Sequence, residues 1–222
     1  MTNATELTQD IYKAFDDANA QDPNHIEVDG NSQPKELIFA KRLTDEVLAL
    51  DPDASLALRL AARCQHICRW EIPRDTQPMG RAGYLKWRQE LKKFHAQKAG
   101  EILRELKTHE DLITQVQELN LKKNLKSDPD CQTLEDALCI VFLKYQFDDL
   151  IESTEEDKMI RIVQKTWAKM SEQGQQHALR IDFSPAATDI LTKFLKAYCV
   201  GCVWGVAHAA GAAVAAADAV RG

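Results

Sequence analysis

Apolar residues recur every three or four positions along most of this chain, which is the spacing that places them on one face of an α-helix. In the first such segment, Leu7, Ile11 and Phe15 share a face. No alternating pattern of useful length predicts β-strands, and there is no repeat or glycine-rich phosphate loop. We therefore predict an all-α fold, a compact helical array, with helices over residues 5–19, 35–50, 56–70, 84–106, 110–121, 133–151, 155–173 and 185–195.

The helix expected over residues 56–70 is apolar on more than one side, which predicts a central position in the fold. It nevertheless carries Gln65 and His66 between Cys64 and Cys68. Pro73 prevents the helix from continuing. A polar, titratable pair in an apolar helix needs a hydrogen-bonding partner or a function, so this stretch is the first candidate for a site.

The last 26 residues differ from the rest, because residues 197–217 are nearly uncharged and rich in alanine. Their length matches the ~20 residues that span a bilayer, and Gly201 and Gly205 form a G-x-x-x-G pattern. Alanine is weakly hydrophobic, however, and His208 interrupts the segment. We predict one helical domain over residues 1–196 and a tail over 197–222 that either packs loosely or associates with a membrane.

The formal net charge of −6 argues against a protein whose whole surface binds nucleic acid or anionic lipid. The first ten residues contain no apolar signal segment, which favours a reducing compartment and a cytoplasmic location. In that setting most of the six cysteines are expected to be small buried hydrophobic residues rather than disulfides.

Three residues of metal-ligand type fall on apolar helices: His66, His95 and Asp136. Imidazole and carboxylate groups that converge in a helical array would suit a divalent metal ion such as Zn, Mn or Fe. The alternative is structural, since a histidine on an apolar face is commonly a hydrogen-bonded core residue. Asp136 could equally be a charge near a helix N-terminus.

Cations and aromatic residues are concentrated between positions 69 and 92, where four arginines fall within twenty residues of an acidic chain. Arginine forks match phosphate and carboxylate groups, and the aromatic rings could stack a base. Ion pairing at the surface and simple packing are the alternatives. The candidate substrate-binding residues are Arg69, Trp70, Arg74, Arg81, Tyr84, Arg88 and Lys92.

Three segments resemble motifs of the HD-domain metal-dependent phosphohydrolases, in the same order and over roughly residues 34–150. They are L-A-A-R-C-Q-H-I-C-R-W (60–70), H-A-Q-K-A-G-E-I-L (95–103) and E-D-A-L (135–138). The chain departs from that family where Gln65-His66 replaces the His-Asp pair, and where Phe39 stands near the family's first histidine.

The HD resemblance implies an HD-like core and a divalent metal, Mn, Fe, Zn or Mg, which would activate water for phosphate-ester hydrolysis. The implied metal ligands are His95 and Asp136 directly, His66 by substitution, and Glu36 in place of the missing histidine. The implied catalytic residues are Gln65, His66 and Arg69.

The chain also resembles a family of uncharacterised bacterial and fungal proteins from about residue 15 to 195. The resemblance is carried by P-K-E-L (34–37), Q-H-I-C-R-W-E-I-P-R (65–74), G-R-A-G-Y-L-K-W-R (80–88), F-H-A (94–96) and Q-T-L-E-D (132–136). The tail lies outside it.

The sequence therefore supports three alternative hypotheses for the function. The first is a metal-dependent phosphohydrolase acting on a phosphorylated small molecule or nucleotide, with no nucleic-acid polymer as partner. The second, motivated by Gln65-His66, is a non-catalytic HD-like module that binds an anionic ligand or a protein partner. The third is a helical adaptor whose buried polar residues only fix packing.

Overall fold

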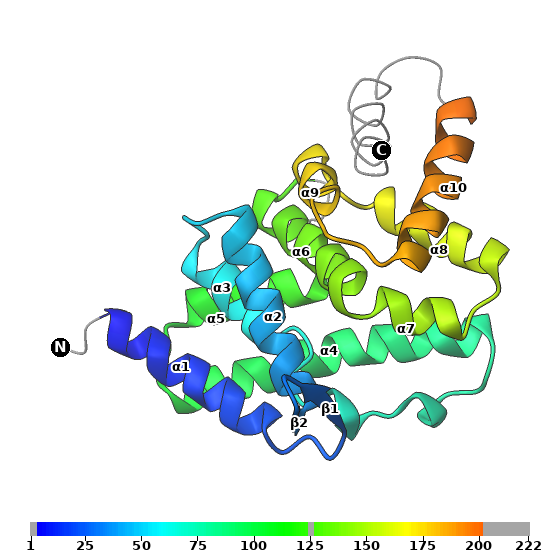
Figure 1. Cartoon of the computed structure of the whole chain (residues 1–222). Coiled ribbons are helices and arrows are strands. Elements are labelled where there is room, and N and C mark those ends of the chain that lie inside the picture. Colours follow the sequence, from blue (N-terminus) through cyan, green and yellow to red (C-terminus); the bar gives the residue numbers. More distant parts are fainter. Residues whose placement is uncertain (1–3, 124–126, 202–222) are drawn as a thin grey trace. The chain divides into compact units, whose positions relative to one another are not determined.

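The computed structural model describes residues 4–123 and 127–201, and these residues are mainly helical, as predicted (Figure 1). By its internal contacts the chain divides into two compact units, residues 1–137 and 138–222. The division falls within helix α6 (Pro129–Tyr145). All the candidate site residues belong to the first unit.

The first unit begins with helix α1 and a short β-hairpin and continues with helices packed around α3. In chain order its elements are α1 (Ala4–Asn19), β1 (His25–Val28), β2 (Asn31–Pro34), α2 (Lys35–Leu50), α3 (Leu56–Cys64), the 3-10 turns η1 (Arg69–Glu71) and η2 (Arg74–Thr76), α4 (Arg81–Glu105), α5 (Glu110–Leu121) and the first part of α6.

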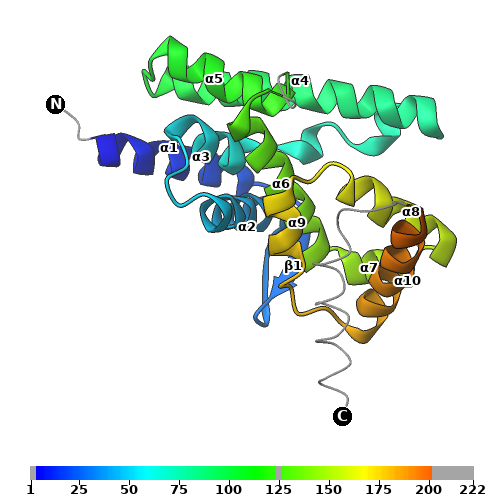
Figure 2. The ribbon, with the colours of Figure 1, turned by 90° about the horizontal axis from the view of Figure 1, so that it is seen from above.

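Helix α3 is the centre of this unit, as its all-round apolar sequence predicts. It packs against α1, α2 and α5, and Leu58 and Leu60 are completely buried. The side chain of Ser55 starts the helix by accepting a hydrogen bond from the backbone N–H of Leu58 at 3.0 Å. Helices α4 and α5 lie side by side (Figure 2).

The hairpin over residues 25–34 corrects the expectation that the chain forms no β-strand. Strands β1 and β2 pair antiparallel, with His25 opposite Pro34 and Val28 opposite Asn31. Asp29 and Gly30 both have positive φ, at 52° and 74°, which suits a two-residue hairpin turn. Because β2 ends at Pro34, directly before α2, the hairpin fixes where the first turn of α2 begins.

The stretch after α3 also differs from the prediction, because the helix ends at Cys64 rather than near Trp70. Gln65 and His66 therefore lie in a turn. Cys68 adopts a left-handed conformation with φ 50°, and its backbone N–H donates to the Asn19 side chain at 3.0 Å. A contact from α1 thus stabilises a backbone that the local sequence does not favour.

The second unit contains the rest of α6, then α7 (Phe147–Glu152), α8 (Glu156–Trp167), α9 (Glu172–Ala178) and α10 (Pro185–Gly201). The helices expected over 133–151 and 155–173 are each interrupted, at Gln146 and between Trp167 and Glu172. A core containing Phe147, Trp167 and Phe194 holds these short helices together.

The expected tail falls largely outside the described residues, which end at Gly201. In the described part of the chain, no helix combines the length and the apolar character needed to cross a membrane.

Candidate functional site

Glu36, His66 and Arg69 come together from two parts of the first unit. Glu36 lies in the first turn of α2, where its backbone N–H donates to the buried Asp22 carboxylate at 3.0 Å. Its Oε2 atom is 3.3 Å from Nδ1 of His66, and its Oε1 atom is 3.9 Å from Nε of Arg69. We call these three residues the Glu36 cluster.

Glu36 is buried, with 7% of the residue exposed. Burial raises its pKa from 4.5 to about 7; Arg69 and Lys35 oppose the shift and the Asp22 carboxylate adds to it. Glu36 therefore exchanges its proton near neutral pH, where an ordinary glutamate is fully ionised.

His66 is a neutral imidazole that contacts an aromatic ring on Phe39 and a carboxyl group on Glu36. Its ring stacks on Phe39 with centroids 4.0 Å apart and planes at 9°. Burial lowers its pKa well below 6.5, and the nearby cations Arg69, Lys122, Arg88 and Lys35 lower it further. The close contact with Glu36 therefore joins a neutral ring to a carboxyl group that is largely protonated below pH 7.

His95 lies on α4, with its ring centroid 5.6 Å from that of His66. It is 2% exposed, and burial lowers its pKa well below 6.5. It makes a hydrogen bond to the backbone of Gln65, while its Nε2 atom is buried without a hydrogen-bond partner. Oε2 of Glu36 and Oε1 of Gln65 are buried and lack hydrogen-bond partners in the same way.

Asp136 is buried on α6, where it accepts a hydrogen bond from the Gln132 side chain at 2.9 Å. Throughout residues 4–123 and 127–201, no three His, Cys, Asp or Glu side chains are grouped closely enough to hold a metal ion. The structure thus brings Glu36, His66 and His95 together, and Asp136 does not complete a ligand set with them.

Arg69 is the candidate substrate-binding residue that contacts Glu36. Its guanidinium lies over the ring of Trp87, 4.8 Å from the centroid. The Trp87 indole is itself fixed, because its Nε1–H donates to the Ile72 carbonyl at 2.9 Å. Cation–π contact and the Glu36 carboxyl together restrict the orientation of the Arg69 fork.

The other predicted cations have different surroundings. Arg74 donates to the carbonyls of Gln77 and Pro78 at 2.9 and 3.1 Å, so it stabilises the loop before α4. Arg88 donates to the Tyr84 hydroxyl at 3.1 Å. Trp70 and Lys92 are half-buried, on η1 and α4, and Arg81 is exposed at the start of α4.

The comparison with known families covers this whole site, since the match runs over residues 9–191. The chain belongs to the family described as a domain of unknown function, DUF4202. This confirms the predicted relationship to an uncharacterised family, and the tail again falls outside it. No curated protein and no solved structure matches the chain.

The sequence of this DUF4202 chain did not indicate Lys122 as a residue of the candidate site. Its ammonium group forms a largely buried ion pair with Glu135, and its charge acts on His66. Lys122 follows the last residue of α5 in a left-handed conformation, with φ 54°. The position is 56 residues from His66, and no local pattern connects the two.

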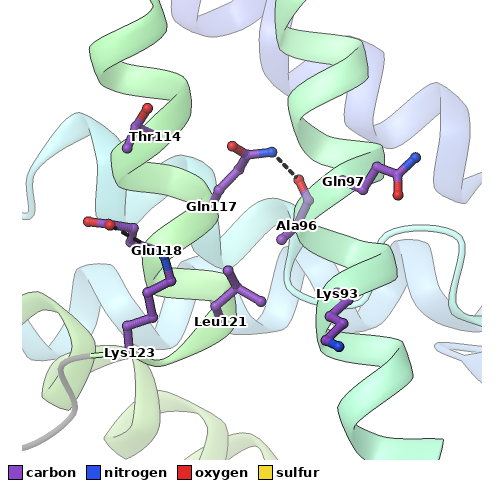
Figure 3. A pocket seen from close by; sticks show the side chains of 8 residues that line it. All are labelled: Lys93, Ala96, Gln97, Thr114, Gln117, Glu118, Leu121 and Lys123. Carbon is purple, nitrogen blue, oxygen red and sulfur yellow. Dashed lines mark hydrogen bonds and ion pairs between the residues drawn. The ribbon is translucent and has the colours of Figure 1, made fainter.

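The same DUF4202 chain has a groove between α4 and α5, with a volume of about 320 Å³ (Figure 3). The Gln117 side chain crosses from α5 to the Ala96 carbonyl of α4 at 2.9 Å. A side chain at Gly100 would meet Gln117, since an added Cβ would lie 2.4 Å from its Nε2 atom. Glu36, His66 and Arg69 do not line this groove.

Proposed function

We propose that the Glu36 cluster is the binding site for a phosphorylated small molecule or nucleotide. The observation that carries this proposal is the placement of Arg69, whose guanidinium is held over the Trp87 ring at 4.8 Å and lies 3.9 Å from the Glu36 carboxyl group. The positive charges of Arg88, Lys122 and Lys35, together with that of Arg69, act on the adjacent neutral ring of His66. Phosphate groups are the ligands that such a concentration of cations favours.

Arg69 is the residue best prepared to hold a phosphate oxygen. Trp87 and Glu36 fix its guanidinium before any ligand binds, so less side-chain entropy is lost on binding. Arg88, held by Tyr84, is a second donor, since its charge acts on both His66 and Arg69.

Glu36 supplies proton chemistry at the same place. A carboxyl group with a pKa of about 7 is suited to give or accept a proton at neutral pH. Its Oε2 atom is buried 3.3 Å from Nδ1 of His66 and makes no hydrogen bond, so the hydrogen-bonding capacity of this oxygen is not used within the protein. This supports an acid–base role, in addition to binding, for the proposed site.

Metal-dependent hydrolysis, which the HD-domain resemblance implies, is the second candidate. It is favoured by His95, whose ring bonds the Gln65 backbone while Nε2 has no partner, an orientation that is common in metal-binding histidines. His66 would supply the second nitrogen. The fit is incomplete, because the described residues offer no group of three donors, so no catalytic step is derived through a metal.

Binding is tested by calorimetry with inorganic phosphate, a nucleoside monophosphate and a sugar phosphate. Arg69→Gln and Arg88→Gln should each weaken binding at least about tenfold, since a hydrogen bond to a charged group contributes roughly 1.5–3 kcal/mol. Arg104→Gln is the matched control, because Arg104 pairs with Glu110 at the far end of α4. Equal affinity in all four proteins would refute the proposed site.

The metal candidate is tested by measuring phosphate release after loading with Mn, Fe, Zn or Mg. Loss of metal-stimulated release in His95→Gln, with release retained in His25→Gln, would support it, because His25 is an exposed residue of β1. If no metal binds and no phosphate is released while calorimetry still detects the ligand, the site is a non-catalytic binding site.

A further inference from the structure

The three most exposed large hydrophobic side chains of the described residues lie within one short segment. Met79, Leu85 and Tyr84 are 84%, 52% and 42% exposed. They occur at the loop before α4 and in the first two turns of that helix. Exposed large apolar groups that cluster in this way indicate a surface that contacts something else.

The charged residues of this segment are all positive. From Thr76 to Gln89 the chain contains no aspartate or glutamate, while Arg81, Lys86 and Arg88 supply three positive charges. The whole chain has a net charge of −6, so the segment stands out against its background. Any partner of this surface must present negative charge together with an apolar environment.

The helical geometry collects these residues on one side. At 3.6 residues per turn, Arg81, Leu85 and Arg88 fall within an arc of about 60°, with Tyr84 flanking it on one side and Lys86 on the other. Gly83, Trp87 and Leu91 occupy the remaining side of the helix and are buried. We call Met79, Arg81, Tyr84, Leu85, Lys86 and Arg88 the α4 surface.

Helix α5 leaves the α4 surface uncovered, since α5 has 12 residues and α4 has 25. Figure 2 shows the N-terminal part of α4 continuing beyond the end of α5. Gly83 also allows the Pro78 carbonyl to approach, because an added Cβ would lie 1.9 Å from that oxygen. The loop that carries Met79 is therefore held close against the helix.

We propose that the α4 surface docks on an anionic lipid bilayer. Its apolar side chains project from a convex helix rather than lining a groove, and basic residues surround them. This combination is typical of helices that lie in the membrane interface, where Leu and Met enter the acyl boundary and Lys and Arg bind lipid headgroups. An acidic protein would complement the charge but leave Met79 and Leu85 without an apolar environment.

The proposal does not depend on the ligand of the Glu36 cluster, and it concerns residues other than the C-terminal tail. It is tested by co-sedimentation of the full-length protein with phosphatidylcholine vesicles, with and without phosphatidylserine. Binding should require phosphatidylserine and decrease with added salt. The double variant Met79→Gln/Leu85→Gln should weaken binding about tenfold or more, and Leu48→Gln, at another exposed leucine, should not.

The charge contribution is tested with Arg81→Gln/Lys86→Gln. Each cation near an anionic surface should change the affinity about fivefold, whereas Lys41→Gln, at an exposed lysine of α2, should have no effect. Equal binding to both kinds of vesicle would overturn the proposal, as would vesicle binding that survives Met79→Gln/Leu85→Gln. Capture of polyglutamate without vesicle binding would instead identify an acidic protein as the partner.

Discussion

Replacing Glu36 by glutamine should change how the stability of the protein depends on pH. Glutamine has nearly the shape of a protonated glutamate but cannot ionise. Since burial raises the pKa of Glu36 from 4.5 to about 7, the folded protein holds this proton more tightly than the unfolded chain does. Its contribution to stability is complete below pH 4.5 and is lost as the pH rises through about 7.

The size of the change in the free energy of unfolding follows from the pKa shift of Glu36. One pKa unit corresponds to about 1.4 kcal/mol, so a rise from 4.5 to about 7 corresponds to about 3 kcal/mol. Wild type should lose this amount, relative to Glu36→Gln, between about pH 4.5 and pH 8. His66 and His95 have lowered pKa values, so their contribution is lost as the pH falls below 6.5. Both proteins contain these histidines, and the difference between them isolates Glu36.

The assay is urea unfolding, followed by tryptophan fluorescence, of both proteins over this pH range. The two should have similar stability at the acid end, and the variant should become the more stable protein as the pH rises. A constant difference across the range would refute the raised pKa of Glu36, and with it the acid–base role proposed for this residue.

Three further outcomes are expected. Gly83→Ala should destabilise the protein by about 1–3 kcal/mol, measured by thermal melting, because its Cβ would overlap the Pro78 carbonyl oxygen. Cys64 and Cys68, whose pKa values burial raises to about 12 and about 11, should react with a thiol reagent only after unfolding. Sulfate affinity, measured by calorimetry, should fall as the pH rises through about 7 in wild type and stay level in Glu36→Gln, because ionised Glu36 repels the anion.

Helices with continuous apolar spacing and clear end signals were predictable from the sequence. The expected bounds of 35–50 and 110–121 agree with α2 and α5. Prediction from the local sequence pattern failed where contacts with residues distant in the sequence determine the backbone conformation. Neither proline nor glycine marks the break at Gln146, and the left-handed turn at Cys68 is held by Asn19, 49 residues away.

The hairpin was missed although the sequence contained a signal for it. Asp29-Gly30 is a favoured hairpin turn, and the preceding strand alternates between exposed and half-buried residues. If Asp29 and Gly30 are taken only as residues that interrupt helices, they predict a loop and not a hairpin. The omission affects the site, because the hairpin and Asp22 together position the first turn of α2 and therefore Glu36.

The candidate site was predictable only in part. Glu36, His66 and His95 follow one another at intervals of about thirty positions, so spacing could not show that they meet. The expectation that they meet came from the resemblance of their segments to known motifs. Lys122 and its buried pair with Glu135 were missed, because both residues look like ordinary surface charges in the sequence. Arg74 was expected at a ligand but bonds the carbonyls of its own loop.

The charges of the Glu36 cluster bear on which ligand the proposed site would favour. An aspartate at position 66, as in the His-Asp pair that Gln65-His66 replaces, would add a negative charge to that of Glu36 and compensate the nearby cations. His66 is instead neutral and packs flat against Phe39. Below pH 7 Glu36 is largely neutral as well, so the charges of Arg69 and Arg88 are least compensated there. A divalent cation would have to bind against the same positive charges, and its affinity should depend on the ionised form of Glu36. In the proposed site, the protonation of this one carboxyl group would therefore determine which sign of charge the cluster accepts.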